Sequence, residues 1–212
     1  MLPTRIFENQ IFMKVLHPTR VNPIERMNAT EPSWLVSECI AGNHVAIEMF
    51  VRQHETGVFR LAYSVLGDEA DANEVTQETF LAALRSLHRY QERQSLKAWL
   101  YTIALNLSRS HLRKHKVIER LKAAVGGIFR VEAQKQVTPE DQVIQTEQEA
   151  TLWKELNKLD ERHRTAVVLR YFHDLPIAEI AQVMGTCEGT IHSRLHTARE
   201  RLKDALQSLR GE

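Results

Sequence analysis

Apolar side chains recur every three or four positions along most of the chain from Trp34 onward, which places them on one face of an α-helix. Gly42, Gly67 and a polar stretch interrupt this pattern and predict where helices end. The helices expected in this part cover residues 34–41, 43–66, 69–88 and 95–116. No segment sustains the strict alternation of a strand, so the fold is predicted to be all-α.

A helix-turn-helix is predicted over residues 175–209. Pro176 opens its first helix, because the first turn has no acceptor for the N–H that proline lacks. Gly185 ends that helix, since the residue just past a helix often adopts a positive φ. Thr186 is then expected to cap a second, longer helix that starts at Cys187.

The second of these helices has two different faces. Its inward stripe is predicted to hold Ile191, Leu195, Ala198, Leu202 and Leu209. Its outward side chains are small or polar, namely Gly189, His192, Ser193, His196 and Glu200. Because Arg194 and Arg199 flank that outward face, it suits a DNA major groove with cations at the phosphates. An ordinary helical hairpin with a solvated, charged face is the alternative on pattern alone.

Helix-breaking residues and stretches without periodicity divide the chain into a leader, two helical domains and a linker. The expected bounds are 1–33 for a disordered leader, 34–116 for the first domain, 117–138 for a flexible linker and 139–209 for the second domain. Thr138 and Pro139 predict a capped helix start, and Asp160 begins a further helix. Val117–Val125 is either linker or an extension of the preceding helix. The leader has scattered prolines and no periodicity, so a chain that starts at Met27 is expected to be active.

Charge is segregated along the chain although the whole is almost neutral, with 28 basic and 27 acidic residues. Residues 61–84 contain five acids and no Lys or Arg, whereas residues 105–130 contain seven Lys or Arg and one acid. The net charge of the whole chain therefore does not reveal these two segments. Their own charges predict one acidic surface and one basic surface suited to nucleic acid.

One predicted helix carries an acidic stripe. It consists of Asp71, Glu74 and Glu78 at positions i, i+3 and i+7, with Gln77 and Leu81 beside them. Val75 and Thr79 fall on the opposite, inward face. The stripe indicates a basic partner, and a solvated helix face is the alternative without further context.

A second segment combines aromatic and basic side chains. Its members are Tyr90, Trp99, Tyr101, Asn106, Arg109, Arg113, Lys114 and Lys116. Aromatic faces and cations together suit separated DNA strands, which they hold by stacking and by pairing with phosphates. Trp99 lies in an apolar stretch and is expected to belong to the core, so Asn106 and the cations are the better DNA candidates.

Three motifs occur in a fixed order: DANEVTQETF at 71–80, WLYTIA at 99–104 with Asn106, and GTIHSRL at 189–195 with Ala198 and Arg199. Together they resemble the motifs of bacterial sigma factors of the extracytoplasmic-function (ECF) group. The resemblance covers about residues 34–209. It implies two helical domains that bring core RNA polymerase to a promoter, one opening the −10 element and one recognising the −35 element.

The resemblance also implies roles for individual residues and for partners. The clamp coiled coil of the polymerase would contact Asp71, Glu74, Gln77, Glu78 and Leu81, and the flap would be a further contact. The −10 element would be held by Tyr90, Asn106, Arg109, Arg113, Lys114 and Lys116. The −35 element would be contacted by Thr190, His192, Ser193, Arg194, His196 and Arg199. Promoter DNA and an anti-sigma factor are thus the other expected partners.

Four positions depart from the family pattern. Leu96 stands where an aromatic residue is frequent, and Leu105 and Ser110 replace a usual Arg and Asp. Thr197 stands where relatives often have Arg, so one phosphate contact is missing. These departures bear on the promoter sequence rather than on the class of protein.

No catalytic constellation, glycine-rich phosphate loop or nucleophile elbow occurs, so neither an enzyme nor a cofactor is predicted. His111 and His115 form an i, i+4 pair, as do His192 and His196, but no third ligand is evident and no metal site is predicted. The two cysteines form no disulfide framework, and no bilayer-spanning run or secretory signal is seen, so a cytosolic protein without membrane insertion is expected.

Two other classes remain open from the residues alone. A free-standing helix-turn-helix regulator needs neither the acidic stripe nor the aromatic and basic segment from Tyr90 to Lys116. It usually needs a dimer to span two half-sites. A metal sensor acting through the histidine pairs is the weaker alternative.

Overall fold

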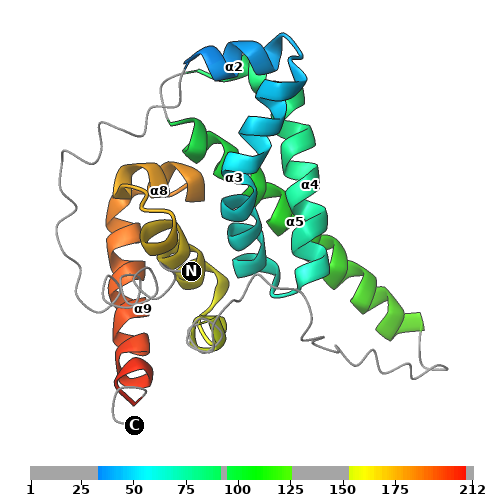
Figure 1. Cartoon of the computed structure of the whole chain (residues 1–212). Coiled ribbons are helices and arrows are strands. Elements are labelled where there is room, and N and C mark those ends of the chain that lie inside the picture. The colour runs from blue at the N-terminus through cyan, green and yellow to red at the C-terminus, as the bar shows by residue number, and fades with distance from the viewer. Residues whose placement is uncertain (1–32, 92–94, 126–152, 209–212) are drawn as a thin grey trace, which may run out of the picture.

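The computed structural model describes residues 33–91, 95–125 and 153–208. This part of the chain is helical and holds no strand, as predicted (Figure 1). The first half consists of α2 (Ser33–Ile40), α3 (His44–Leu66), α4 (Glu69–Ser86), the 3-10 turn η2 (Leu87–Arg89) and α5 (Leu96–Val125). The second half holds helical residues 153–157, then α7 (Glu161–Val167), the π-helical segment η3 (Val168–Phe172), α8 (Ile177–Met184) and α9 (Glu188–Ser208).

The helix boundaries follow from local capping. Asn43 Oδ1 accepts the backbone N–H groups of Val45 and Ala46 at the start of α3. Gly67 ends α3 with φ of +70°, a conformation that glycine adopts without steric cost. Asp68 then caps α4 by accepting the N–H of Asp71. The breaks predicted between the first helices are therefore confirmed.

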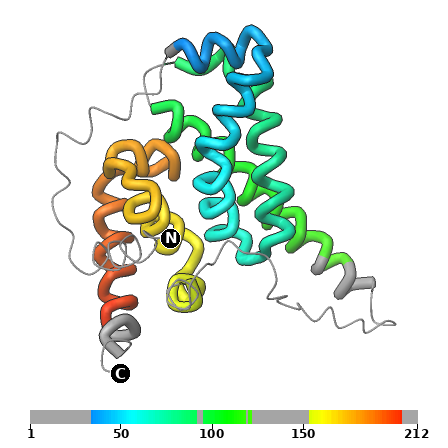
Figure 2. Tube along the Cα trace, viewed as in Figure 1, coloured from blue at the N-terminus to red at the C-terminus, as the bar shows by residue number. Residues whose placement is uncertain are grey.

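Helices α3, α4 and α5 form a bundle that α2 covers at one end (Figure 1). Its core contains large side chains such as Phe50 and Phe80, whose rings meet edge to face at 5.8 Å between centroids. Helix α5 continues beyond the bundle (Figure 2), and its bounds reach Val125, so Val117–Val125 is an extension of the helix. Of the two alternatives for this stretch the helical extension is correct and the end at Lys116 is not, because no Gly or Pro occurs before Gly126.

The second half packs directly on the first. Helix α8 contacts α5, and α7 with η3 contacts α3, so that one continuous cluster of buried side chains runs through both halves. The rings of Tyr63 and Trp153 meet edge to face across this boundary at 5.4 Å. The two predicted helical units are thus present, and they share one core. The expected leader up to residue 32, the start at Thr138 and most of the linker lie outside the described residues.

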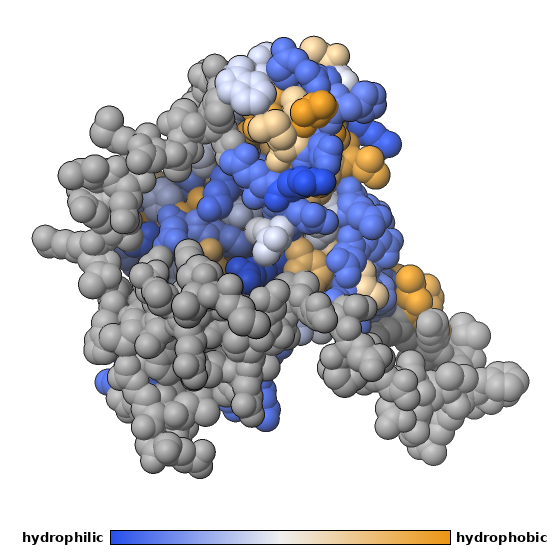
Figure 3. All heavy atoms as spheres, viewed as in Figure 1, coloured by the Kyte–Doolittle hydropathy of each residue, from blue (hydrophilic) through white to orange (hydrophobic). Residues whose placement is uncertain are grey.

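The face drawn in Figure 3 is largely hydrophilic, with apolar side chains gathered over the end of the bundle where α2 meets α3. Exposed apolar residues in these two helices are Trp34, Ile40, Val45 and Met49. Among the helices that the structure describes, none combines the length and the hydropathy needed to cross a bilayer.

Candidate nucleic-acid interface

The turn between α8 and α9 sets the direction of the second helix. Gly185 has φ of +62°, and its N–H bonds to the carbonyl of Gln182. The N–H of Thr186 bonds to the carbonyl of Ala181, which completes a Schellman motif at the end of α8. Thr186 therefore belongs to the end of α8, and the prediction that it caps α9 was wrong.

Cys187 takes the capping position of α9 instead. Its carbonyl accepts the N–H of Ile191, and its Sγ lies 3.1 Å from Thr190 Oγ1. Hydrogen bonds from the Thr190 hydroxyl and backbone N–H lower the pKa of the exposed Cys187 thiol. The hydroxyl of Thr190, a predicted DNA contact, is thus engaged with the turn.

The two faces of α9 lie as the periodicity predicted. The inward residues Ile191, Leu195, Ala198 and Leu202 are buried against the rest of the second half, and Leu209, the last residue predicted for this stripe, lies outside the described residues. The outward residues Gly189, His192, Ser193, His196 and Glu200 are all exposed. Arg194 and Arg199 are half-buried at the margins, and Arg199 Nε donates to the Leu195 carbonyl at 3.4 Å. The first turns of α9 therefore present small polar side chains with a guanidinium on either side, which a major groove accepts.

The acidic stripe on α4 is exposed except at its first member. Its exposed residues are Glu74, Gln77, Glu78 and Leu81, while Val75 and Thr79 are buried as predicted. Leu81 is 55% exposed, so an apolar side chain stands beside the acids. Asp71 turns away toward α5, where its Oδ1 lies 3.2 Å from His111 Nε2.

The basic side of α5 is divided between solvent and the second half of the chain. Arg113, Lys114 and Lys116 are exposed, as is Asn106. Arg109 instead pairs with Glu161 at the start of α7, with distances of 3.0 Å and 3.1 Å from its Nη2 and Nε to the same carboxylate oxygen. The cluster predicted for the −10 element is therefore exposed only in part.

The aromatic members of that segment belong mainly to the core. Tyr90 is half-buried and packs against Trp99, with ring centroids 5.5 Å apart. Trp99 is itself only half-buried, whereas Tyr101 is 2% exposed. Trp99, which was expected in the core, packs against it but stays half-buried, whereas Tyr101 lies fully within it.

Polar groups cross the boundary between the two halves in a way that no local pattern indicates. Tyr101 Oη is hydrogen bonded to Nδ1 of His173 at 3.1 Å, and Lys97 Nζ donates to the His173 carbonyl at 2.8 Å. Ser95 Oγ donates to Glu179 at 2.7 Å. Burial, with the charges of Lys97 and Arg60, lowers the pKa of His173 to about 3. The imidazole is therefore neutral at physiological pH.

Comparison with known proteins gives the family. Residues 50–117 match the model of Sigma-70 region 2, and residues 150–202 match that of Sigma-70, region 4. The ECF RNA polymerase sigma factor SigW of Bacillus subtilis is 30% identical over 173 residues, covering 79% of this chain and 92% of SigW. The RNA polymerase sigma-H factor of Pseudomonas aeruginosa is 32% identical over 183 residues, covering 84% of this chain and 95% of its own length.

The fold agrees with a solved relative. The structure of CnrH in complex with the cytosolic domain of CnrY superposes with a TM-score of 0.59 at 26% identity, covering 82% of this chain and 96% of that one. Both family models match in the same chain, and relatives at 30% and 32% identity align over most of their length, so the chain belongs to the ECF group of RNA polymerase sigma factors.

Proposed function

We propose that this sigma factor brings core RNA polymerase to its promoters by placing α9 in the major groove of the −35 element. The observation that carries this assignment is the exposed face of α9. Its residues His192, Ser193 and His196 are free of the core while the opposite face is fully buried. Side chains in the first turns of a recognition helix reach base edges, and Arg194 and Arg199 at the margins are placed for phosphates.

The exposed part of α4 is the proposed contact with the polymerase. Glu74 and Glu78 supply negative charge, and Leu81 supplies an apolar anchor beside them. Charges at an interface chiefly steer association, whereas a desolvated apolar side chain contributes to affinity. The partner surface is therefore basic with an apolar pocket, which fits the clamp coiled coil that the resemblance implies.

The exposed cations of α5 are the proposed contact with the opened −10 element. Arg113, Lys114 and Lys116 lie on the part of the helix that leaves the bundle. Arg109 can join them only after its pair with Glu161 is broken. That pair is about one quarter exposed on each side, so water screens it and its loss costs roughly 1 kcal/mol or less.

The distance between the −10 and −35 elements requires the two halves of the chain to separate on the promoter. The −10 and −35 elements are about 25 base pairs apart, or on the order of 80 Å at about 3.4 Å per pair. A compact chain of 212 residues has a radius of gyration of roughly 17 Å, and so a diameter of about 45 Å. A packed molecule is therefore too short to hold both elements, and we infer that the domains, within 34–116 and 139–209, part when the holoenzyme binds DNA.

The remaining assignments follow from the same proposal. CnrH has been solved in complex with a protein partner, the cytosolic domain of CnrY. Because the resemblance to ECF sigma factors implies an anti-sigma factor, we propose that a partner of this kind binds this chain and holds it inactive. The chain would act in the cytoplasm, where its polymerase is, and without catalysis of its own, because the polymerase performs the chemistry.

The proposal is tested with core polymerase, a labelled chain and two matched charge reversals. The variant Glu74→Lys/Glu78→Lys inverts the exposed stripe, and the control Glu48→Lys/Glu55→Lys makes the same charge change on α3. We expect the stripe variant to bind core polymerase at least tenfold more weakly, a change of about 1.4 kcal/mol, and the control to bind like wild type. Equal binding by all three chains would refute the assignment of α4.

A further inference from the structure

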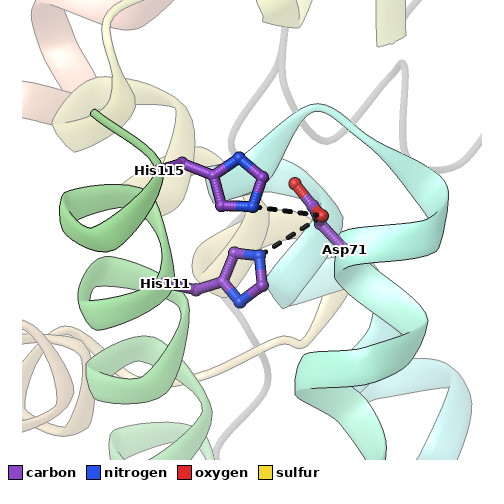
Figure 4. Close-up of side chains that lie close together, drawn as sticks. All are labelled: Asp71, His111 and His115. Atoms are coloured by element: carbon purple, nitrogen blue, oxygen red, sulfur yellow. Dashed lines mark ion pairs between the residues drawn. The ribbon is translucent and has the colours of Figure 1, made fainter. Parts of the chain in front are cut away.

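Two helices bring three potential metal ligands to one point. His111 and His115 lie one turn apart on α5, and Asp71 lies opposite them in the first turn of α4 (Figure 4). Asp71 Oδ1 is 3.2 Å from Nε2 of His111 and 3.8 Å from Nε2 of His115. One ligand atom from each residue can be chosen so that all three lie within 4.8 Å of one another.

The geometry at His111 differs from that of an ordinary histidine–aspartate hydrogen bond. Nε2 of His111 is inaccessible to solvent and has no hydrogen-bond partner, although Asp71 Oδ1 is within reach. The ring nitrogen therefore does not point along the line to the carboxylate oxygen. Metal ligands behave in this way, because their lone pairs converge on a point between the donor atoms rather than on each other.

The separations agree with a small coordination sphere. Zinc ligands lie about 2.1 Å from the ion, so two ligands at the tetrahedral angle are about 3.4 Å apart. The two distances to Asp71 Oδ1 lie on either side of this value. The rings of His111 and His115 are stacked with centroids 4.7 Å apart and an interplanar angle of 25°, so both Nε2 atoms face the same side. His115 is half-exposed and is free to adjust, whereas His111 and Asp71 are held between the helices.

We propose that Asp71, His111 and His115 form a binding site for a divalent transition ion, with Zn²⁺ as the ion it fits. Two imidazole nitrogens and one carboxylate oxygen are the ligands that zinc accepts, and water completes the fourth position. The sequence indicated only the histidine pair, and the fold supplies the third ligand from another helix.

Metal binding has a structural consequence for α5. The ion joins the start of α4 to the segment of α5 from His111 onward, in which His111 is still half-buried and residues 113–118 are exposed. This segment carries the exposed Arg113, Lys114 and Lys116. Occupancy therefore holds the basic segment in place, and its effect on promoter opening, unlike the site itself, rests on the proposed function.

The site is tested on the full chain alone, without polymerase or DNA, so that failure of the proposed function leaves the result intact. Metal-free protein is titrated with Zn²⁺ in competition with a chromophoric chelator, and Co²⁺ serves as a spectroscopic probe of coordination. The variants are Asp71→Asn, His111→Gln and His115→Gln. The control His192→Gln/His196→Gln removes the other i, i+4 pair, for which the described part of the chain offers no nearby third ligand.

We expect one Zn²⁺ per chain and a loss of affinity of about tenfold or more in each of the three variants, with the control like wild type. Because His115 is half-exposed, His115→Gln keeps the fold, which thermal unfolding of the metal-free protein verifies. Zn²⁺ should also slow hydrogen exchange of the α5 amides beyond His111 in wild type and not in His115→Gln. Unchanged Zn²⁺ affinity in all three variants, or loss of binding in the control alone, would overturn the proposal.

Discussion

Gly57 of α3 faces the contact between the two halves, and its replacement by alanine tests that packing. A Cβ at this position would overlap Tyr101 Oη, would lie 3.3 Å from Tyr101 Cζ and would lie 3.6 Å from Cε1 of His173. Tyr101 cannot turn aside freely, because it is buried and its hydroxyl is bonded to His173. The alanine methyl must therefore be accommodated by a shift of α3 against α5 and η3.

Two opposing terms set the size of the effect. Alanine is favoured over glycine in a helix interior by about 1 kcal/mol, which stabilises the folded state. Overpacking a buried site costs roughly 1–3 kcal/mol. Gly57→Ala is thus expected to lower the free energy of unfolding by up to about 2 kcal/mol. Tyr101→Phe costs about 1–3 kcal/mol, because it leaves His173 Nδ1 without its partner.

The two substitutions should couple. Tyr101→Phe removes the oxygen that the new methyl meets, so in that background Gly57→Ala should cost little or stabilise. The double variant is then less destabilised than the sum of the single ones by about 1–3 kcal/mol. Urea denaturation of the four chains measures this, with Gly189→Ala as a control glycine that has no atom within 4 Å of its Cβ position. Additive effects, or a Gly57→Ala protein more stable than wild type, would refute this account of the packing.

Two further predictions concern pH and promoter opening. Burial and the nearby Lys97 lower the pKa of His54 to about 4 and that of His173 to about 3. Both histidines therefore bind protons less readily in the folded protein than in the unfolded chain. The free energy of unfolding should be highest above pH about 6.5 and should fall as the pH drops toward these pKa values, by roughly 1.4 kcal/mol per pH unit for each histidine. Denaturation curves of His173→Asn at several pH values should show a smaller loss of this free energy than those of wild type. Arg113→Ala/Lys116→Ala should reduce permanganate reactivity of promoter thymines while binding to core polymerase stays normal; equal reactivity would place these cations outside the opened region.

Periodicity predicted the features that arise within one helix. The inward Val75 and Thr79 of α4 and the outward His192 and Ser193 of α9 lie where the helical period places them, because burial there depends on local spacing. Boundaries were less certain where two elements compete for one residue. Thr186 is of a residue type that often caps helices and directly precedes α9, but its N–H bonds to the Ala181 carbonyl at the end of α8.

Contacts between distant segments were not predicted. His173 carries no local sign that it will be buried beside Tyr101, since the site exists only once the halves pack. In the same way Arg109 has the spacing of a phosphate contact, yet Glu161 from the other half holds it. Asp71 was assigned to an exposed stripe, and only the crossing of α4 and α5 directs it to the histidines.

The most direct measurement of the proposed function is a transcription selection from promoters with a randomised −35 element. It compares wild type, His192→Ala, Ser193→Ala and Arg199→Ala as reconstituted holoenzymes. We expect His192→Ala and Ser193→Ala to change the preferred bases, with about 1–3 kcal/mol lost per base contact. We expect Arg199→Ala to retain the wild-type motif with weaker binding and a flatter salt dependence, because a phosphate contact carries no base information. Recovery of the wild-type motif by both His192→Ala and Ser193→Ala would contradict the assignment of α9 to the −35 element.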